Sequence, residues 1–285
     1  MLQKRFPVLL TLLLSLLPYS NILSGFAPYL SEHSFSHYLV ASAALMLVFM
    51  LLGVFLFKRR PRGPFTISGW LFFLTGPFIA PALMMGPPDL SPALLQHIPE
   101  EHFRFTLLLI ATVLLTAGFV ALLKPVWALL SGWQRWIVIP FIVSVVLLCW
   151  DFYSSYTFSR QLSSWTGSGK NAADFFPAYN FNEMLRAGGR SLVYITLAGL
   201  SGILFRMGKL KKWIAVLLAV FCFTGIVFFF LFNFLGPQFY FPFMIPAVAF
   251  APVYWLGMAL LGKRGPLPST TGNEKILHFL FTFEG

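Results

Sequence analysis

The sequence predicts an all-α membrane protein, a polytopic bundle of about eight transmembrane helices with both termini in the cytoplasm. Three observations support this fold class. Hydrophobic residues make up 58% of the 285-residue chain and charged residues only 10%, against about 25% charged in an average soluble domain. The apolar residues form stretches close to the ~20 residues that cross a hydrocarbon core. The gaps between these stretches alternate between rich and poor in Lys and Arg.

Taken in order along the chain, the expected spans are 6–26, 38–57, 65–85, 105–123, 136–156, 190–206, 213–235 and 239–261. They are expected to be helices, because runs such as 9–17 and 228–232 are nearly unbroken apolar stretches, whereas barrel strands alternate. The first span also resembles a secretory signal, with a positive start at 1–5 and an apolar run at 8–17. No A-x-A-like site follows it, which favours retention over cleavage.

The orientation follows from the basic residues. Fifteen of the 20 Lys and Arg lie in the N-terminus, the second, fourth and sixth gaps and the tail, which would all face one side. A Lys/Arg excess marks cytoplasmic loops, so both termini are predicted to be cytoplasmic and the chain to lie in the plasma (inner) membrane. The net charge of +11 therefore reflects topology and attraction to anionic membrane lipid. We expect no nucleic acid to bind this chain.

The two halves of the chain show a weak internal sequence similarity. The second span ends Leu56-Phe57-Lys58 and the sixth ends Leu204-Phe205-Arg206, each before a basic turn. A weak 4+4 internal repeat would produce this, as in many membrane folds. The alternative, which is the more frequent, is that apolar helices commonly end in an aromatic and a basic residue.

Two regions are predicted, a transmembrane bundle over 1–262 and a cytoplasmic linker with a short apolar tail over 263–285. The linker is rich in Gly, Pro, Ser and Thr, and the tail holds the β-type segment Ile276–Phe283. An isolated apolar strand in water seeks an edge to pair with. We therefore expect the tail to pair with a protein partner or with a second copy of the chain.

Asp151 is the one acid expected inside the hydrocarbon, about 22 Å along the fifth span from Trp136. A carboxylate at that depth needs a partner and should face the bundle interior or a wet vestibule. Arg190, which enters the sixth span at a similar depth, is the candidate partner. The two would form either part of a ligand vestibule or a structural pair, which is the interpretation we favour.

The histidines supply a weaker candidate. His33 and His37 have the i, i+4 spacing that places two imidazoles on one face of a helix, a geometry that zinc sites use. Two ligands alone do not define a metal site, and interfacial histidines are the commoner explanation. No cofactor is predicted.

Two segments resemble motifs of intramembrane proteases without completing them. Gly199-Leu200-Ser201-Gly202 is similar to the G-x-S-G of rhomboid-type enzymes, but no later span holds a histidine base. Glu100–Arg104 is similar to the E-E-x-x-x-R of another intramembrane protease family. It is one residue short, and the downstream histidines which that family uses are absent. The sequence therefore predicts no catalytic residues.

The longest external segment, 157–189, carries signals for a short helix lying on the membrane surface. Asn180 and Glu183 make a capping-box-like start, and Gly188-Gly189 would end the helix. The aromatic run Phe228–Phe234 either lines an apolar pocket or, as we favour, is lipid-facing bulk.

These features favour a non-enzymatic sensory or ligand-binding module for a small apolar or amphipathic ligand, coupled to a cytoplasmic output through its tail. The first alternative is a transporter or flippase of apolar cargo. Its weakness is that the spans hold few ionisable side chains. The second alternative is an external-face metal-dependent membrane enzyme built on His33 and His37.

Overall fold

The structure, a computed structural model, describes residues 10–16, 35–57, 63–84, 95, 97–235 and 246–262. Within these ranges the chain is helical and has no strand. The long helices are α3 (Phe35–Phe57), α4 (Pro64–Met84), α5 (Ile98–Val126), α6 (Val138–Gly167), α7 (Phe175–Arg206), α8 (Lys212–Leu235) and α10 (Pro246–Gly262), and a short helical segment covers 10–16. Short 3-10 turns lie at Trp127–Leu129, Trp133–Ile137 and Ala172–Asp174.

Among the residues that the structure describes, six helices are long and apolar enough to cross a membrane, which bears out the prediction of an all-helical, membrane-embedded fold. They cover Phe35–Phe57, Pro64–Ala82, Ile98–Leu129, Trp133–Gly167, Ala187–Arg206 and Lys212–Leu231. Of the expected first span only 10–16 is described, and α10 has 17 residues, fewer than a full crossing usually needs. The count of eight spans therefore stays a prediction, as does the orientation of the termini.

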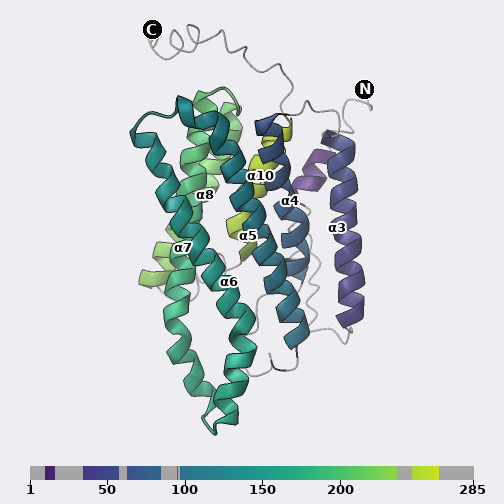
Figure 1. Ribbon diagram of the computed structural model, residues 1–285, viewed down its shortest axis with the longest axis vertical. Helices are drawn as coiled ribbons and strands as arrows, with labels where there is room; N and C mark the ends of the chain where they lie inside the picture. The colour runs from purple at the N-terminus through teal and green to yellow at the C-terminus, as the bar shows by residue number, and fades with distance from the viewer. Residues whose placement is uncertain are drawn as a thin grey trace.

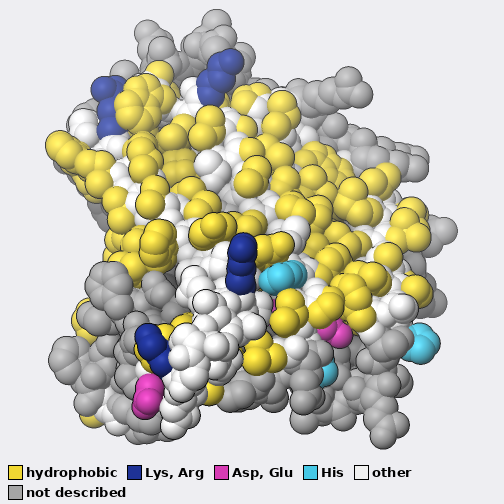
Figure 2. Space-filling view, turned by 60° about the horizontal axis from the view of Figure 1, so that its bottom comes forward, with side chains coloured by type: hydrophobic (Ala, Val, Ile, Leu, Met, Phe, Trp, Pro, Cys, Tyr) yellow, Lys and Arg dark blue, Asp and Glu magenta, His cyan; other side chains and the backbone are white. Residues whose placement is uncertain are grey.

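The helices run up and down side by side, with α3 at one edge and α6 and α7 reaching furthest (Figure 1). Extensive contacts join α4 with α5 and α10, α6 with α5 and α7, and α7 with α8. Large apolar side chains cover much of the outer surface, and few charged ones interrupt it (Figure 2). A water-facing surface of this composition would be unfavourable, so lipid is the natural surrounding.

The bundle has two distinct ends. At the end that we call the basic end, α5 connects to α6 and α7 to α8 (Figure 1), through segments that hold Arg135, Lys209 and Lys211. At the opposite end, which we call the hairpin end, α6 connects to α7 through 168–174. The helix pair α6 and α7 projects beyond its neighbours there. With 30 and 32 residues, these helices are about 45 Å long, more than the ~30 Å of hydrocarbon.

Several helices are therefore longer than hydropathy predicted. The fourth span, expected at 105–123, lies in a helix that begins at Ile98. The fifth, expected at 136–156, lies in one that continues to Gly167. Hydropathy detects the lipid-facing part of a helix, but the backbone bonding continues past the interface as long as no breaker intervenes.

The predicted surface helix is wrong at both ends, because α7 begins at Phe175, before Asn180, and continues through Gly188-Gly189 to Arg206. Gly189 serves a close helix crossing instead of a turn. A Cβ on Gly189 would lie 2.8 Å from Leu147 Cβ on α6. A small residue is needed where two helix backbones approach this closely.

A second close crossing joins α4 to α10. A Cβ on Gly257 would clash with the backbone nitrogen of Phe73 and would lie 2.8 Å from the carbonyl oxygen of Gly69. This crossing holds the last helix against α4, and a separate apolar cluster around Phe49, Phe73 and Leu14 packs beside it. This cluster therefore joins residues from the first third of the chain to Tyr254, Met258 and Leu261 near its end.

Candidate functional site

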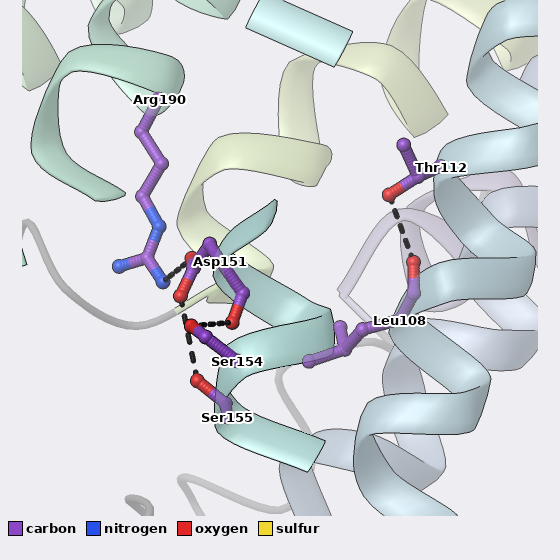
Figure 3. Close-up of polar contacts among 6 residues, drawn as sticks. All are labelled: Leu108, Thr112, Asp151, Ser154, Ser155 and Arg190. Carbon is purple, nitrogen blue, oxygen red and sulfur yellow. Dashed lines mark hydrogen bonds and ion pairs between the residues drawn. The ribbon is translucent and has the colours of Figure 1, made fainter. Parts of the chain in front are cut away.

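Asp151 and Arg190 meet in the interior of the bundle. Arg190 of α7 donates a hydrogen bond from Nη2 to Asp151 Oδ2 of α6 at 3.1 Å, and the two charges form an ion pair (Figure 3). Their side chains are only 1–2% exposed. The two residues that the sequence predicts as candidate partners are thus brought together.

Serine hydroxyls surround the Asp151 carboxylate and its backbone. Ser155 Oγ donates to Asp151 Oδ1 at 3.5 Å, and Ser154 Oγ donates to the Asp151 carbonyl at 3.0 Å (Figure 3). Both serines are buried. Hydrogen bonds to the charged form of a buried acid offset part of its desolvation cost.

A second buried ion pair lies at the beginning of α5. Arg104 Nη1 is 3.3 Å from Glu101 Oε1, and the two residues are 1–2% exposed. The sequence interpretation placed both residues in an external loop, where they would be solvated. The structure instead places them in the first turns of a helix that begins seven residues before the expected span.

A signal for this second pair was present in the sequence. Buried positions on α5 recur at spacings of three and four residues, as in Glu101, Arg104, Leu108, Ala111 and Leu115. This is the a/d spacing of helices packed side by side. Following the pattern upstream of Leu108, instead of stopping where hydropathy falls, would have predicted Arg104 and Glu101 as interior residues.

The way α5 packs against α6 places the two ion pairs at neighbouring heights along the long axis of the bundle. The His102 ring of α5 stacks on Tyr156 of α6 with centroids 4.2 Å apart, and its Nε2 lies 3.4 Å from Ser159 Oγ. Because α5 and α6 run antiparallel (Figure 1), Asp151 then lies about level with Leu108. Arg104 lies about one helical turn nearer the hairpin end.

We call this set the polar section. It comprises Glu101 and Arg104 of α5, Asp151, Ser154, Ser155 and Ser159 of α6, and Arg190 of α7, all buried.

Toward the basic end, the interior between α5 and α6 holds mainly apolar side chains. The rings of Phe119 and Phe141 stack there with centroids 3.6 Å apart, among buried leucines such as Leu115 and Leu122. Buried hydroxyls in this half bond to their own helices, as Ser144 does to the Phe141 carbonyl at 2.7 Å. Packed apolar side chains therefore fill the contact between α5 and α6 toward the basic end.

The other predicted candidates lie elsewhere. His37 is exposed in the first turn of α3, while His33 and the tail segment Ile276–Phe283 lie outside the described residues. Across the described ranges, no three His, Cys, Asp or Glu side chains gather as metal ligands would. The His33/His37 pair stays a prediction.

The chain matches no protein-family model, and no curated protein or solved structure is similar to it at a significant level.

Proposed function

We propose that this protein is a non-enzymatic sensory module of the plasma membrane that binds a small amphipathic ligand in its polar section. The observation that carries the proposal is the burial of two ion pairs and several hydroxyls inside an otherwise apolar bundle. Buried charges are costly in a membrane protein, and where they occur they commonly mark ligand or ion sites. An amphipathic molecule would place its polar group there and its apolar part among the surrounding aromatic and aliphatic side chains.

The output is proposed to pass through the cytoplasmic tail. This part of the proposal rests on the sequence alone, because residues 263–285 lie outside the described ranges. The apolar segment Ile276–Phe283 would pair with a protein partner or with a second copy of the chain. Ligand binding would change how α10, which leads directly into the tail, presents that segment.

Ligand binding is tested by native mass spectrometry of the purified protein with two probes, dioleoylglycerol and dioleoyl phosphatidate. At least one probe should bind saturably to the natural chain. The double variant Asp151→Leu/Arg190→Leu should bind that probe at least about tenfold more weakly. It should still fold, because replacing a buried pair with apolar groups is often neutral for stability. The matched control, Arg160→Gln/Asp174→Asn, changes two exposed charges and should bind normally.

The output is tested in a second experiment, by crosslinking in native membranes. Addition of the bound probe should change the crosslinking of the full chain to its partner, and a chain ending at Lys263 should show no such change. Equal behaviour of the two chains would remove the tail from the proposal. Failure of both probes to bind would contradict the binding function itself.

Transport of apolar cargo is the alternative. The Phe119–Phe141 stack favours binding over passage, because these rings pack α5 against α6 toward the basic end. Reconstituted vesicles distinguish the two functions. Protein-dependent movement of labelled dioleoylglycerol between leaflets would establish a flippase and contradict the sensory proposal.

A further inference from the structure

We propose that an anionic phospholipid of the surrounding membrane binds at the turn between α7 and α8, where Arg206, Lys211 and Lys212 hold its phosphate. This turn lies at the basic end of the bundle, away from the polar section (Figure 1). The lipid site goes beyond the proposed function and does not depend on it. Its support comes from the fixed backbone of the turn, the charges that the turn exposes and the apolar surface beside them.

The backbone of the turn is held in one conformation. α7 ends at Arg206, and Gly208 follows with a φ of 63°, the left-handed conformation that ends many helices. The backbone N–H groups of Lys209 and Leu210 both donate to the Leu204 carbonyl, at 2.7 and 3.2 Å. The Leu210 side chain is only 5% exposed, so it anchors the turn in the core. The basic side chains of the turn are therefore carried by a fixed backbone.

Three cations of the turn are exposed. They are Arg206, Lys211 and Lys212, and no Asp or Glu occurs between positions 206 and 212. Backbone N–H groups already donate to the carbonyls of residues 203–205, so the cations are not needed to cap α7. Lys211 and Lys212 also stand at the beginning of α8, whose dipole end is positive and repels them. A bound anion would offset this repulsion.

The fourth cation of the turn already has a contact within the bundle. Lys209 Nζ lies 4.7 Å from the centroid of the Phe65 ring at the beginning of α4, which is a cation–π distance. This contact joins the turn to α4. The cations that a lipid phosphate can reach are therefore the three exposed ones.

The surface beside these cations is apolar. Phe205 and Trp213 are 42% and 64% exposed, and aromatic side chains of this kind anchor helices at the membrane interface. One helical turn further into α7, Gly202 is exposed, and a Cβ built on it would have no atom of the described residues within 4 Å. On α8, Val216 and Leu217 are exposed. Apolar surface thus continues from the cations toward the middle of the membrane, where acyl chains lie.

An anionic phospholipid matches both the charges and the apolar surface. Its phosphate accepts charge-assisted hydrogen bonds from Arg and Lys, and each cation near an anionic lipid surface strengthens binding about fivefold. Phosphatidylcholine carries the same phosphate together with a compensating positive charge, so it gains much less. The turn should therefore select lipids by their net charge.

Lipid binding is measured by native mass spectrometry of the full chain in an uncharged detergent, with dioleoyl phosphatidylglycerol and dioleoyl phosphatidylcholine. The two lipids share their acyl chains and differ in net charge. Phosphatidylglycerol should bind saturably and at least about tenfold more tightly than phosphatidylcholine. Raising the ionic strength should reduce this preference, because salt screens exposed charges.

Paired variants locate the site. Lys211→Gln/Lys212→Gln should weaken phosphatidylglycerol binding at least about tenfold and leave phosphatidylcholine binding unchanged. Lys211→Arg/Lys212→Arg should keep the preference because it keeps both charges. The matched control, Lys124→Gln/Arg135→Gln, removes two exposed charges from the α5–α6 side of the same end and should also keep the preference.

Four results would overturn the proposal. The first is equal affinity for the two lipids, and the second is a preference that survives in Lys211→Gln/Lys212→Gln. The third is an equal loss in Lys124→Gln/Arg135→Gln, which would show general charge attraction instead of a site. The fourth is displacement of the lipid by equimolar glycerol phosphate, which would show a site for soluble phosphate.

A final variant separates this site from the proposed function. Asp151→Leu/Arg190→Leu, which should abolish ligand binding in the polar section, should keep the preference for phosphatidylglycerol over phosphatidylcholine. If neither dioleoylglycerol nor dioleoyl phosphatidate binds in the polar section, the lipid site at the turn still stands. Loss of the preference in this variant would place the anionic lipid in the polar section and would overturn the site at the turn.

Discussion

At the scale of single residues, the polar section depends on each buried charge having its counter-charge. Asp151 and Arg190 are 39 positions apart in the sequence, yet their charged groups lie 3.1 Å apart with almost no exposure. Removing one partner would leave a lone charge in a low-dielectric interior, which costs far more than losing the pair as a unit. We therefore expect the effects of substituting Asp151 and Arg190 on the free energy of unfolding to be strongly non-additive.

A double-mutant cycle measures this coupling. Asp151→Asn and Arg190→Gln should each lower the free energy of unfolding by about 3–5 kcal/mol, because each leaves the other charge unpaired. The double variant should lose less than the sum of the two single losses. Equilibrium unfolding in mixed micelles, followed by tryptophan fluorescence, gives the values. The exposed Arg160→Gln should produce no measurable change, and simple additivity of the two buried variants would contradict the pairing.

At the scale of elements, tyrosine and tryptophan side chains satisfy carbonyls near helix ends inside the bundle. Tyr254 Oη of α10 donates to the Leu14 carbonyl at 2.7 Å, and Trp255 Nε1 donates to the Ser15 carbonyl at 3.1 Å. Position 18 is a proline, which has no backbone N–H for the Leu14 carbonyl to accept. Tyr38 Oη of α3 likewise donates at 2.8 Å to the Pro81 carbonyl in the last turn of α4.

Replacing Tyr254 with phenylalanine should lower the free energy of unfolding by about 1–2 kcal/mol. The Leu14 carbonyl would lose its donor, while the ring contacts with Phe49 and Phe73 would be kept. Thermal and denaturant unfolding of the purified variant would report the loss. Tyr153→Phe is the matched control because Tyr153 is 60% exposed. Equal stability of the two variants would mean that the hydrogen bond to the segment 10–16 contributes nothing.

At the scale of the whole molecule, the two ends of the bundle differ in charge, length and interior. Basic connections mark one end, while the α6–α7 hairpin extends beyond the other (Figure 1). The polar section lies toward the hairpin end and the Phe119–Phe141 stack toward the basic end. If the basic end is cytoplasmic, a ligand would reach the polar section from the external side.

Cysteine labelling of two matched serines tests this orientation. Ser131 and Ser168 are both exposed and lie in connections at opposite ends of the bundle. In a background with Cys149 and Cys222 replaced by alanine, Ser168→Cys should react with an impermeant maleimide in intact cells. Ser131→Cys should react only after the membrane is permeabilised. The reverse pattern would invert the topology and place the polar section toward the cytoplasm.

Local composition is enough to predict the membrane class, the helical fold and most helix positions. These properties depend on local composition, because a run of about 20 apolar residues in lipid must satisfy its backbone internally and so forms a helix. The same local reasoning named Asp151 and Arg190, since an acid within an apolar stretch is visible without a structure.

Which charges are interior and which glycines lie at helix crossings depends instead on how the helices pack. Glu101 and Arg104 fall outside the hydropathy maximum but inside the packed bundle. In the sequence, Gly188-Gly189 is typical of a helix end. In the structure it lies within α7, where Gly189 accommodates Leu147 of α6. The contact between Tyr254 and Leu14 spans 240 positions. Burial and close approach depend on which helices become neighbours, and that is set by side-chain packing across the whole bundle, which hydropathy along one segment does not encode.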